Sequence, residues 1–123
     1  MALYCGIDLH STNCWAAVLD EDRRLIRERK VSNDLGELLD VLEPYRADLE
    51  GIAVESTFNW YWLVDGLMEA GYQVHLTNTW AAKQYEGLKY SDDRHDARWL
   101  AHLLSLGILP EGFIYPKEGN SSP

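Results

Sequence analysis

The sequence predicts an α/β domain built on a mixed five-stranded sheet with helices on both faces. Three apolar segments joined by short connections open the chain, and such a series is typical of an antiparallel meander. Helical and strand patterns alternate after it, which favours a sheet covered by helices. The length of 123 residues suits one domain, and 46% hydrophobic residues suffice for a core.

The three opening segments predict three strands. Residues 3–9 and 13–20 are strongly apolar, and the first of these segments closes near an acid, Asp8. An acidic turn at residues 20–22 leads to residues 25–31, where apolar and charged side chains alternate imperfectly. This alternation predicts an edge-like strand, and the short connections predict that the three strands pair antiparallel.

The remainder of the chain alternates helices with strands. Leucines at helical spacing predict a helix over residues 35–45, with Ser32, Asn33 or Asp34 as its cap. The later elements are a strand over 51–55 that ends in Glu55, a helix over 59–70 stopped by Gly71, a strand over 72–77, a short helix over 79–87, a polar loop over 89–93 and a helix over 94–106 ended by Gly107 and Pro110. This order of elements is the ribonuclease H-like order.

The charge balance separates several classes of protein. A net charge of -9 argues against strong nucleic-acid binding by this chain alone, because phosphates are neutralised by Lys and Arg. Five of the eleven basic residues fall between Arg23 and Lys30, where acids nearly cancel them, which predicts a solvated hairpin and not a DNA patch. No apolar run reaches the roughly 18 residues of a membrane helix. Residues 1–7 contain no basic segment of a signal peptide, so a cytoplasmic protein is expected.

The cysteine and histidine patterns argue against a zinc site. The two cysteines, Cys5 and Cys14, are too few for a disulfide scaffold, and no further cysteine completes a zinc pattern. The four histidines contain no HxxxH pair. We expect both cysteines to be buried, reduced thiols on neighbouring strands.

Acidic residues end two of the predicted strands and begin the last helix. Asp8 closes the first strand and Glu55 closes the fourth, and strand ends are where α/β sheets bind ligands. Asp93 and Asp96 are three residues apart, a spacing that puts both on one helix face. Asp92 and Asp96 also share a face, so Asp92 is an alternative to Asp93. If the first and fourth strands are adjacent, as this topology predicts, these carboxylates can meet at one edge of the sheet.

Such a cluster of carboxylates favours a divalent metal site. Carboxylate oxygens suit hard cations such as Mg²⁺ or Mn²⁺, and two such ions can flank a phosphodiester bond. Without a cation the carboxylates would repel one another. Each acid also has an ordinary structural alternative: Asp8 could begin a turn, Glu55 could cap the next helix, and Asp92 or Asp93 could be the N-cap of the last helix.

Three motifs, taken together in their order and spacing, resemble a known family. They are Gly6-Ile7-Asp8-Leu9-His10, Ala53-Val54-Glu55-Ser56-Thr57 and Asp92-Asp93-Arg94-His95-Asp96-Ala97-Arg98. Over about residues 4–118 the sequence resembles the DEDD transposases of the IS110 group of insertion sequences, which are RNA-guided recombinases. The resemblance implies a RuvC-like fold. It also implies that the catalytic acids binding magnesium are Asp8, Glu55, Asp93 and Asp96.

The resemblance further implies partners and a domain plan. It implies a DNA substrate, a bridge RNA that selects target and donor DNA, and a homo-oligomer of the full-length protein. In the family a C-terminal domain supplies a serine that attacks DNA, and no serine of this chain matches that context. We therefore expect a RuvC-like catalytic domain over residues 1–116, a flexible tail over 117–123, no serine domain, and a reaction that is incomplete in this chain alone. Lys89, Arg94 and Arg98 are candidates for phosphate contacts.

Two other functions are alternatives at this point. An actin-like or sugar-kinase ATPase would place glycine in a phosphate turn after the first strand, where this chain has His10. A non-catalytic remnant that binds nucleic acid or a partner protomer is favoured by the five tryptophans and seven tyrosines, because aromatic side chains can stack on bases. Trp62 and Trp99 are expected in the core, and exposed aromatic residues could form an interface.

Overall fold

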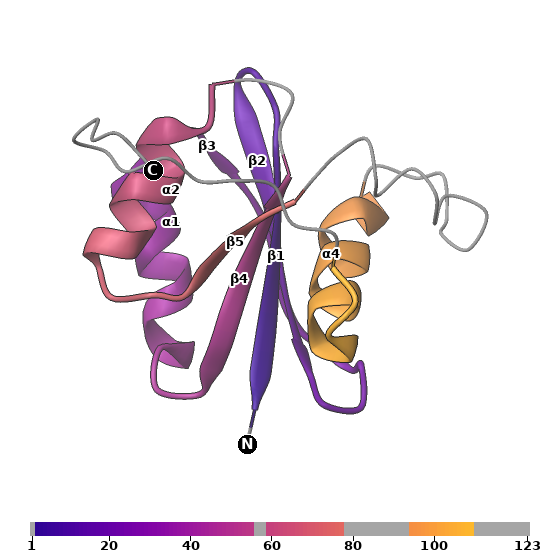
Figure 1. The fold of residues 1–123 in the computed structure, drawn as a ribbon. Coiled ribbons are helices and arrows are strands. Elements are labelled where there is room, and N and C mark those ends of the chain that lie inside the picture. Colours follow the sequence, from indigo (N-terminus) through magenta and orange to yellow (C-terminus); the bar gives the residue numbers. More distant parts are fainter. Residues whose placement is uncertain (1, 56–58, 78–93, 110–123) are drawn as a thin grey trace, which may run out of the picture.

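The computed structural model describes residues 2–55, 59–77 and 94–109. Its strands are β1 (Leu3–Leu9), β2 (Asn13–Asp20), β3 (Leu25–Ser32), β4 (Leu49–Glu55) and β5 (Val74–Leu76). Within the described ranges they form a five-stranded mixed sheet in the order β3-β2-β1-β4-β5 (Figure 1). The helices are α1 (Leu35–Leu42), the 3₁₀ turn η1 (Glu43–Tyr45), α2 (Tyr61–Glu69) and α4 (Arg94–Leu106). The predicted mixed sheet and order of elements are confirmed.

The central strand of the sheet is β1. It pairs antiparallel with β2 and parallel with β4. The strand β3 extends the antiparallel side, and β5 extends the parallel side. The turn between β2 and β3 is organised by Asp20, whose carboxylate accepts the backbone N–H of Asp22 at 2.8 Å and of Arg24 at 2.9 Å. The parallel pairing of β1 and β4 brings the ends of both strands to the same edge of the sheet.

Different helices cover the two faces of the sheet. Successive residues of a strand point to opposite faces, so Leu3, Cys5 and Ile7 of β1 belong to the core that includes the leucines of α1 and α2. Gly6 and Asp8 belong to the other face, on which α4 packs against β1, β2 and β4. Figure 1 shows α1 and α2 on one side of the sheet and α4 on the other. The prediction of helices on both faces is confirmed.

The helix ends follow the predicted capping residues. The N-cap of α1 is Asp34, whose carboxylate accepts the N–H of Gly36 at 2.8 Å and of Glu37 at 3.3 Å. The helix α2 ends before Gly71, with φ of 99°, and α4 ends before Gly107, with φ of 73°. Glycine adopts this left-handed conformation without the steric cost that other residues meet, so both glycines stop their helices.

Several element ends differ from the prediction. The helix predicted over 35–45 is α-helical only to Leu42 and continues as η1, because Pro44 has no N–H for an α-helical hydrogen bond. The strand β4 begins two residues earlier than predicted, at Leu49, and β5 is confined to Val74–Leu76, where it pairs with β4. The helix predicted over 79–87, the loop over 89–93 and the tail over 117–123 lie outside the described residues. None of the helices described is long and apolar enough to cross a membrane.

Candidate functional site

Asp8 and Glu55 are neighbours at one edge of the sheet. They are register partners at the ends of the parallel strands β1 and β4, and neighbouring strands lie about 4.8 Å apart. The residues just before them, Ile7 and Val54, belong to the core on the α1 and α2 face, so Asp8 and Glu55 lie on the α4 face. The predicted adjacency of the first and fourth strands is therefore confirmed.

The ordinary alternatives for these two acids do not hold. Asp8 lies within β1, where it is the register partner of Trp15 in β2 and of Glu55 in β4, and it does not begin the turn that follows. The N-cap position of α2 is Trp60, so Glu55 ends β4 and does not cap the helix. Asp8 is also buried, with 5% of its surface exposed. A carboxylate with so little contact with water needs compensation by hydrogen bonds or charge.

The start of α4 is directed toward the same edge. A Cβ atom placed on Gly6 would overlap the backbone oxygen of Ala97, whereas one on Gly51 would lie 3.4 Å from the side chain of Leu104. Gly51 pairs with Tyr4, toward the opposite ends of the two strands, so α4 runs antiparallel to β1 (Figure 1). Residues that precede Ala97 therefore lie toward the end of the sheet that carries Asp8.

Asp96 is the residue of α4 just before Ala97, so its backbone lies in the first turn of the helix, near this edge. The side chain of Asp96 and the whole of Asp92 and Asp93 lie outside the described residues. Their part in the site, and the choice between Asp92 and Asp93, stay predictions. Among the side chains that are described, no group of three or more His, Cys, Asp or Glu residues is arranged to hold a metal ion.

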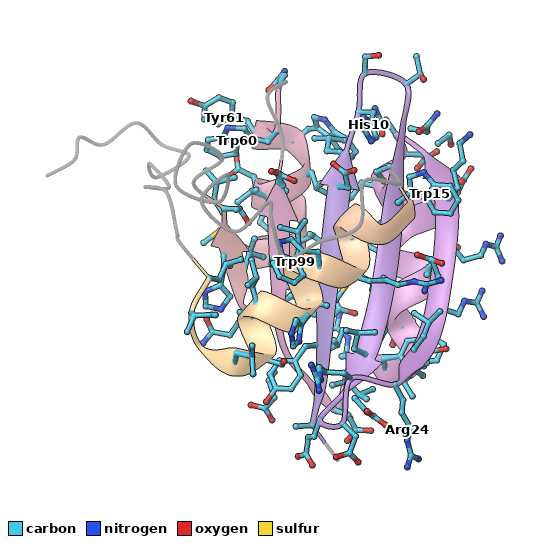
Figure 2. All side chains as sticks on the ribbon, turned by 90° about the vertical axis from the view of Figure 1, so that its right-hand side faces the viewer. His10, Trp15, Arg24, Trp60, Tyr61 and Trp99 are labelled. Atoms are coloured by element: carbon cyan, nitrogen blue, oxygen red, sulfur yellow. The ribbon has the colours of Figure 1, made fainter. Side chains whose placement is uncertain are left out.

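The histidine beside Asp8 was missed by sequence reasoning. The Nε2 atom of His10 lies 3.0 Å from Oδ2 of Asp8. Figure 2 shows His10 at the edge of the sheet where the hairpin between β1 and β2 turns. The motif contains this residue two positions after Asp8. A signal was therefore present, but alternation along a strand says nothing about a side chain that turns back from a loop.

A second missed residue is Thr77, which follows β5. Its backbone N–H donates to the oxygen of Val54 at 2.8 Å, which places it beside Glu55 in the sheet. The residue is 4% exposed, and its hydroxyl oxygen has no hydrogen-bond partner among the residues described. Asp8, Glu55 and Thr77 thus occupy adjacent positions at the ends of three neighbouring strands.

Of the three residues predicted to contact phosphates, Arg98 is the one whose side chain the structure describes. Arg98 forms a two-bond ion pair with Glu28 of β3, at 2.7 and 3.1 Å, so its guanidinium ties α4 to the sheet. Lys89 and the side chain of Arg94 lie outside the described residues. The basic segment between Arg23 and Lys30 lies in the predicted hairpin, and it includes Glu28 of this ion pair, whose side chain is mostly buried.

Both cysteines are free and completely buried, as predicted. Burial, followed by the charges of Asp8 and Glu37, raises the pKa of the Cys14 thiol from 9.0 to about 11. Burial is also the main reason why the pKa of Cys5 is raised. Thiols with raised pKa values remain protonated at neutral pH and are poor metal ligands and nucleophiles. They are part of the core and not of the site.

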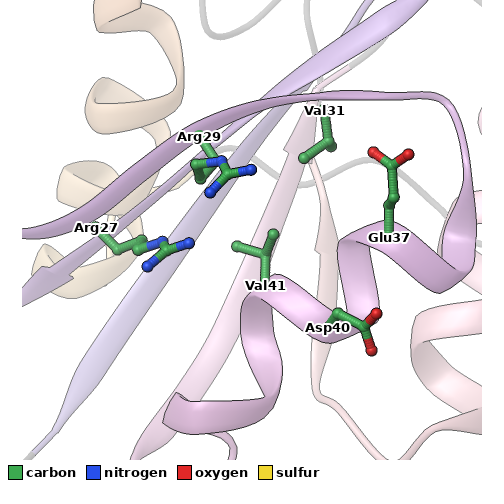
Figure 3. Close-up of a pocket in the computed structure, with 6 residues that line it drawn as sticks. All are labelled: Arg27, Arg29, Val31, Glu37, Asp40 and Val41. Carbon is green, nitrogen blue, oxygen red and sulfur yellow. The ribbon is translucent and has the colours of Figure 1, made fainter.

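A hollow of about 460 Å³ lies between β3 and α1 (Figure 3). It is lined by Arg27, Arg29, Val31, Glu37, Asp40 and Val41. Arg27 and Arg29 alternate with Glu28, which pairs with α4, so the hollow is on the sheet face opposite the α4 face. The carboxylate pair and the hollow are therefore separate features.

The tryptophans expected in the core are only partly buried. Trp60 and Trp62 pack against the core, and Trp99 is half-buried and tilted against His102 with ring centres 5.6 Å apart. The rings of Trp60 and Tyr61 are stacked with centres 4.1 Å apart, and Tyr61 is 51% exposed. Figure 2 labels this pair at the start of α2.

Comparisons with solved structures identify the fold. RuvC of T. thermophilus, solved in complex with a Holliday junction substrate, matches with a TM-score of 0.62 and 18% identity over 90% of this chain and 99% of that chain. The large terminase nuclease of the thermophilic phage G20c matches with a TM-score of 0.53 and 14% identity over 89% of this chain and 57% of that chain. At these identities the likeness shows the fold, which is RuvC-like and ribonuclease H-like as predicted.

Comparison with family models identifies the family. No curated protein matches the sequence significantly. The model of the IS110 DEDD transposases, described as "Transposase", matches residues 5–111 and so spans both Asp8 and Glu55 as well as α4. The chain therefore belongs to the IS110 family of DEDD transposases, and its RuvC-like fold agrees with that membership.

Proposed function

We propose that this chain is the metal-dependent DNA-cleavage and strand-transfer module of a transposase. Asp8 and Glu55 form the sheet half of its catalytic site, and Asp93 and Asp96 complete the site from the start of α4. The observation that carries the proposal is the register pairing of Asp8 with Glu55 on the face where α4 packs. A RuvC relative bound to a DNA junction supports DNA as the substrate.

The donor set fits Mg²⁺ or Mn²⁺. Both described members are carboxylates at the ends of parallel strands, and hard divalent cations prefer oxygen ligands. When bound, such ions activate the attacking oxygen and stabilise the leaving oxygen of a phosphodiester. The buried thiols of Cys5 and Cys14 belong to the core, so soft-metal chemistry has no support among the described residues.

The residues of the chain have separate tasks in this proposal. Asp8 and Glu55 are held on rigid strands, so they define the position of the site before DNA arrives. Asp96 of α4 and Asp93, which directly precedes the helix in the sequence, bring further negative charge, and Lys89 and Arg94 contact phosphates. The paired Arg98 acts through the position of α4 and is not assigned to the substrate. The bridge RNA, the second protomer and a serine-bearing domain are the other components of the full reaction that we propose.

A second candidate function is non-catalytic binding of nucleic acid or of a partner protomer. The stacked rings of Trp60 and Tyr61 favour it, because Tyr61 is half-exposed and therefore accessible to a partner. An exposed aromatic ring can stack on an unpaired base without reading sequence. This function does not require a metal ion, which makes the two candidates separable.

Calorimetric titration of the chain with Mn²⁺ tests the proposal. The variants are Asp8→Asn, Glu55→Gln and Asp96→Asn, and each exchanges a carboxylate for an amide of the same shape. Asn at position 8 still offers an oxygen to His10, so the fold should be kept. Asp40→Asn is the matched control, since Asp40 is exposed on α1 and lies on the other face.

The expected result is Mn²⁺ binding by the wild type and by Asp40→Asn, and loss of binding in the three site variants. Retained affinity in Asp8→Asn or Glu55→Gln would contradict a shared carboxylate site. A wild-type chain that binds DNA without Mn²⁺, and loses that binding in Tyr61→Ala, would instead favour the non-catalytic function.

A further inference from the structure

Asp8 is buried, and one of its side-chain partners comes from the loop that follows its own strand. His10 Nε2 lies 3.0 Å from Asp8 Oδ2. The side chain of His10 is 43% exposed and that of Asp8 is 8% exposed. The imidazole therefore lies between the solvent and an almost fully buried carboxylate.

The backbone of His10 is held on both sides. Its N–H donates to the oxygen of Asn13 at 2.9 Å, which closes the turn between β1 and β2. Its carbonyl oxygen accepts a hydrogen bond of 2.8 Å from the side-chain amide of Asn33, which lies between β3 and α1. These bonds fix the position of the His10 backbone, so the hairpin itself places the imidazole close to Asp8.

The direction of the hydrogen bond follows from the chemistry of the two groups. An ionised carboxylate can only accept a hydrogen bond, so Nε2 carries the proton and its N–H donates a hydrogen bond to Oδ2 of Asp8. In the neutral ring this selects the tautomer with a proton on Nε2. The bond holds one oxygen of the carboxylate and thereby restricts rotation of the whole group.

We propose that His10 is a positioning residue that holds the Asp8 carboxylate in the orientation that binds a divalent cation. This inference rests on the proposed function of Asp8 as a metal ligand. A carboxylate that is already oriented loses less conformational freedom when it binds an ion. Removal of such an outer partner typically lowers metal affinity about 10- to 100-fold.

The first test measures Mn²⁺ affinity by calorimetry in the wild type, His10→Ala, His10→Gln and Ser11→Ala. His10→Ala removes the donor, and we expect its affinity to fall about 10- to 100-fold. The amide of Gln can replace Nε2 as a donor at similar reach, so His10→Gln should recover most of the affinity. Ser11→Ala is the matched control, because Ser11 is an exposed residue of the same turn. Its affinity should equal that of the wild type.

The second test uses the chain without metal. Nitrogen-15 NMR of the imidazole should show the proton of the neutral His10 ring on Nε2. It should also show a change of this signal in Asp8→Ala and none in Ser11→Ala. Without metal, His10→Ala should still unfold cooperatively, at a somewhat lower temperature because the buried Asp8 carboxylate loses this donor, and His10→Gln should restore that temperature. These readouts separate positioning of the carboxylate from a general loss of structure.

Each result decides between specific alternatives. Unchanged or increased Mn²⁺ affinity in His10→Ala, while Asp8→Asn loses binding, would overturn the role of His10 and leave the metal site intact. Equal loss in His10→Ala and His10→Gln would overturn positioning, since it would make the imidazole a direct ligand. A wild type that binds no Mn²⁺ would overturn the metal site and this inference together. The proton found on Nδ1 would contradict the donated bond itself.

Discussion

Gly6 of β1 and Ala97 of α4 approach so closely that a Cβ atom at position 6 would overlap the carbonyl oxygen of Ala97. The same Cβ would lie 2.7 Å from the backbone nitrogen of Ala101, and real Cβ contacts are essentially never under 3.0 Å. Both obstacles are backbone atoms, which cannot move away as a flexible side chain can. Gly6 thus sets how close α4 lies to the sheet, and Asp8 is two residues further along the same strand face.

Gly6→Ala should therefore destabilise the fold by about 3 kcal/mol or more, at or beyond the upper end of ordinary overpacking. Urea unfolding at equilibrium measures this. Gly107→Ala is the control, since its Cβ would meet nothing within 4 Å and only the left-handed φ of 73° opposes it. That variant should lose about 1–2 kcal/mol. Equal effects of the two substitutions would contradict a role for Gly6 in helix packing.

The ion pair between Arg98 and Glu28 should contribute measurably to stability. Its two bonds of 2.7 and 3.1 Å join residues 70 positions apart, and the Glu28 side chain is only 12% exposed. Arg98→Ala would leave that carboxylate poorly solvated, so we expect a loss of about 2 kcal/mol. A double-mutant cycle with Glu28→Gln measures the coupling by urea unfolding. A coupling energy near zero would show that the two side chains do not depend on each other.

The buried hydroxyl of Thr77 should contribute nothing to folding by itself. Its oxygen has no hydrogen-bond partner among the residues described, and the residue is 4% exposed. Thr77→Val replaces the hydroxyl with a methyl group of similar size, so the free energy of unfolding should stay equal or rise by about 1 kcal/mol. Thr77→Ser keeps the hydroxyl and removes a buried methyl, and should lose about 1 kcal/mol. Destabilisation of Thr77→Val beyond that of Thr77→Ser would mean that the hydroxyl is bonded.

Alkaline pH should destabilise the chain through Cys14. Burial and the charges of Asp8 and Glu37 raise the pKa of its thiol from 9.0 to about 11. Between these values the unfolded chain loses the thiol proton while the folded chain keeps it. The contribution to stability is therefore complete below pH 9.0 and is lost as the pH rises to about 11. Urea unfolding across this range should show a smaller decline in Cys14→Ala than in the wild type. An identical decline in both proteins would assign the effect to other groups.

Much of the fold could be predicted from local patterns. The strands that end at Leu9 and Asp20 and the helix from Arg94 to Leu106 were predicted with the bounds that the structure has. Their periodicity lies within each segment, so no distant contact was needed to identify them. The prediction that the first helix is α-helical to Tyr45 was wrong because of Pro44 in η1, and β5 is shorter than predicted because it is confined to the residues that pair with β4.

The candidate site, like the fold, could be predicted from the sequence only in part. The sequence by itself determined which acids end β1 and β4, because a strand's apolar pattern and the acid that closes it are adjacent in the chain. Only the tertiary structure decided that His10 turns back to Asp8, that Arg98 is engaged by Glu28, and that Gly6 admits the backbone of α4. The contact between His10 and Asp8 depends on the path of the loop after β1, and the other two relationships join segments that are remote in sequence. Hydrophobic periodicity records the face that a residue occupies, but not the partner that it meets there.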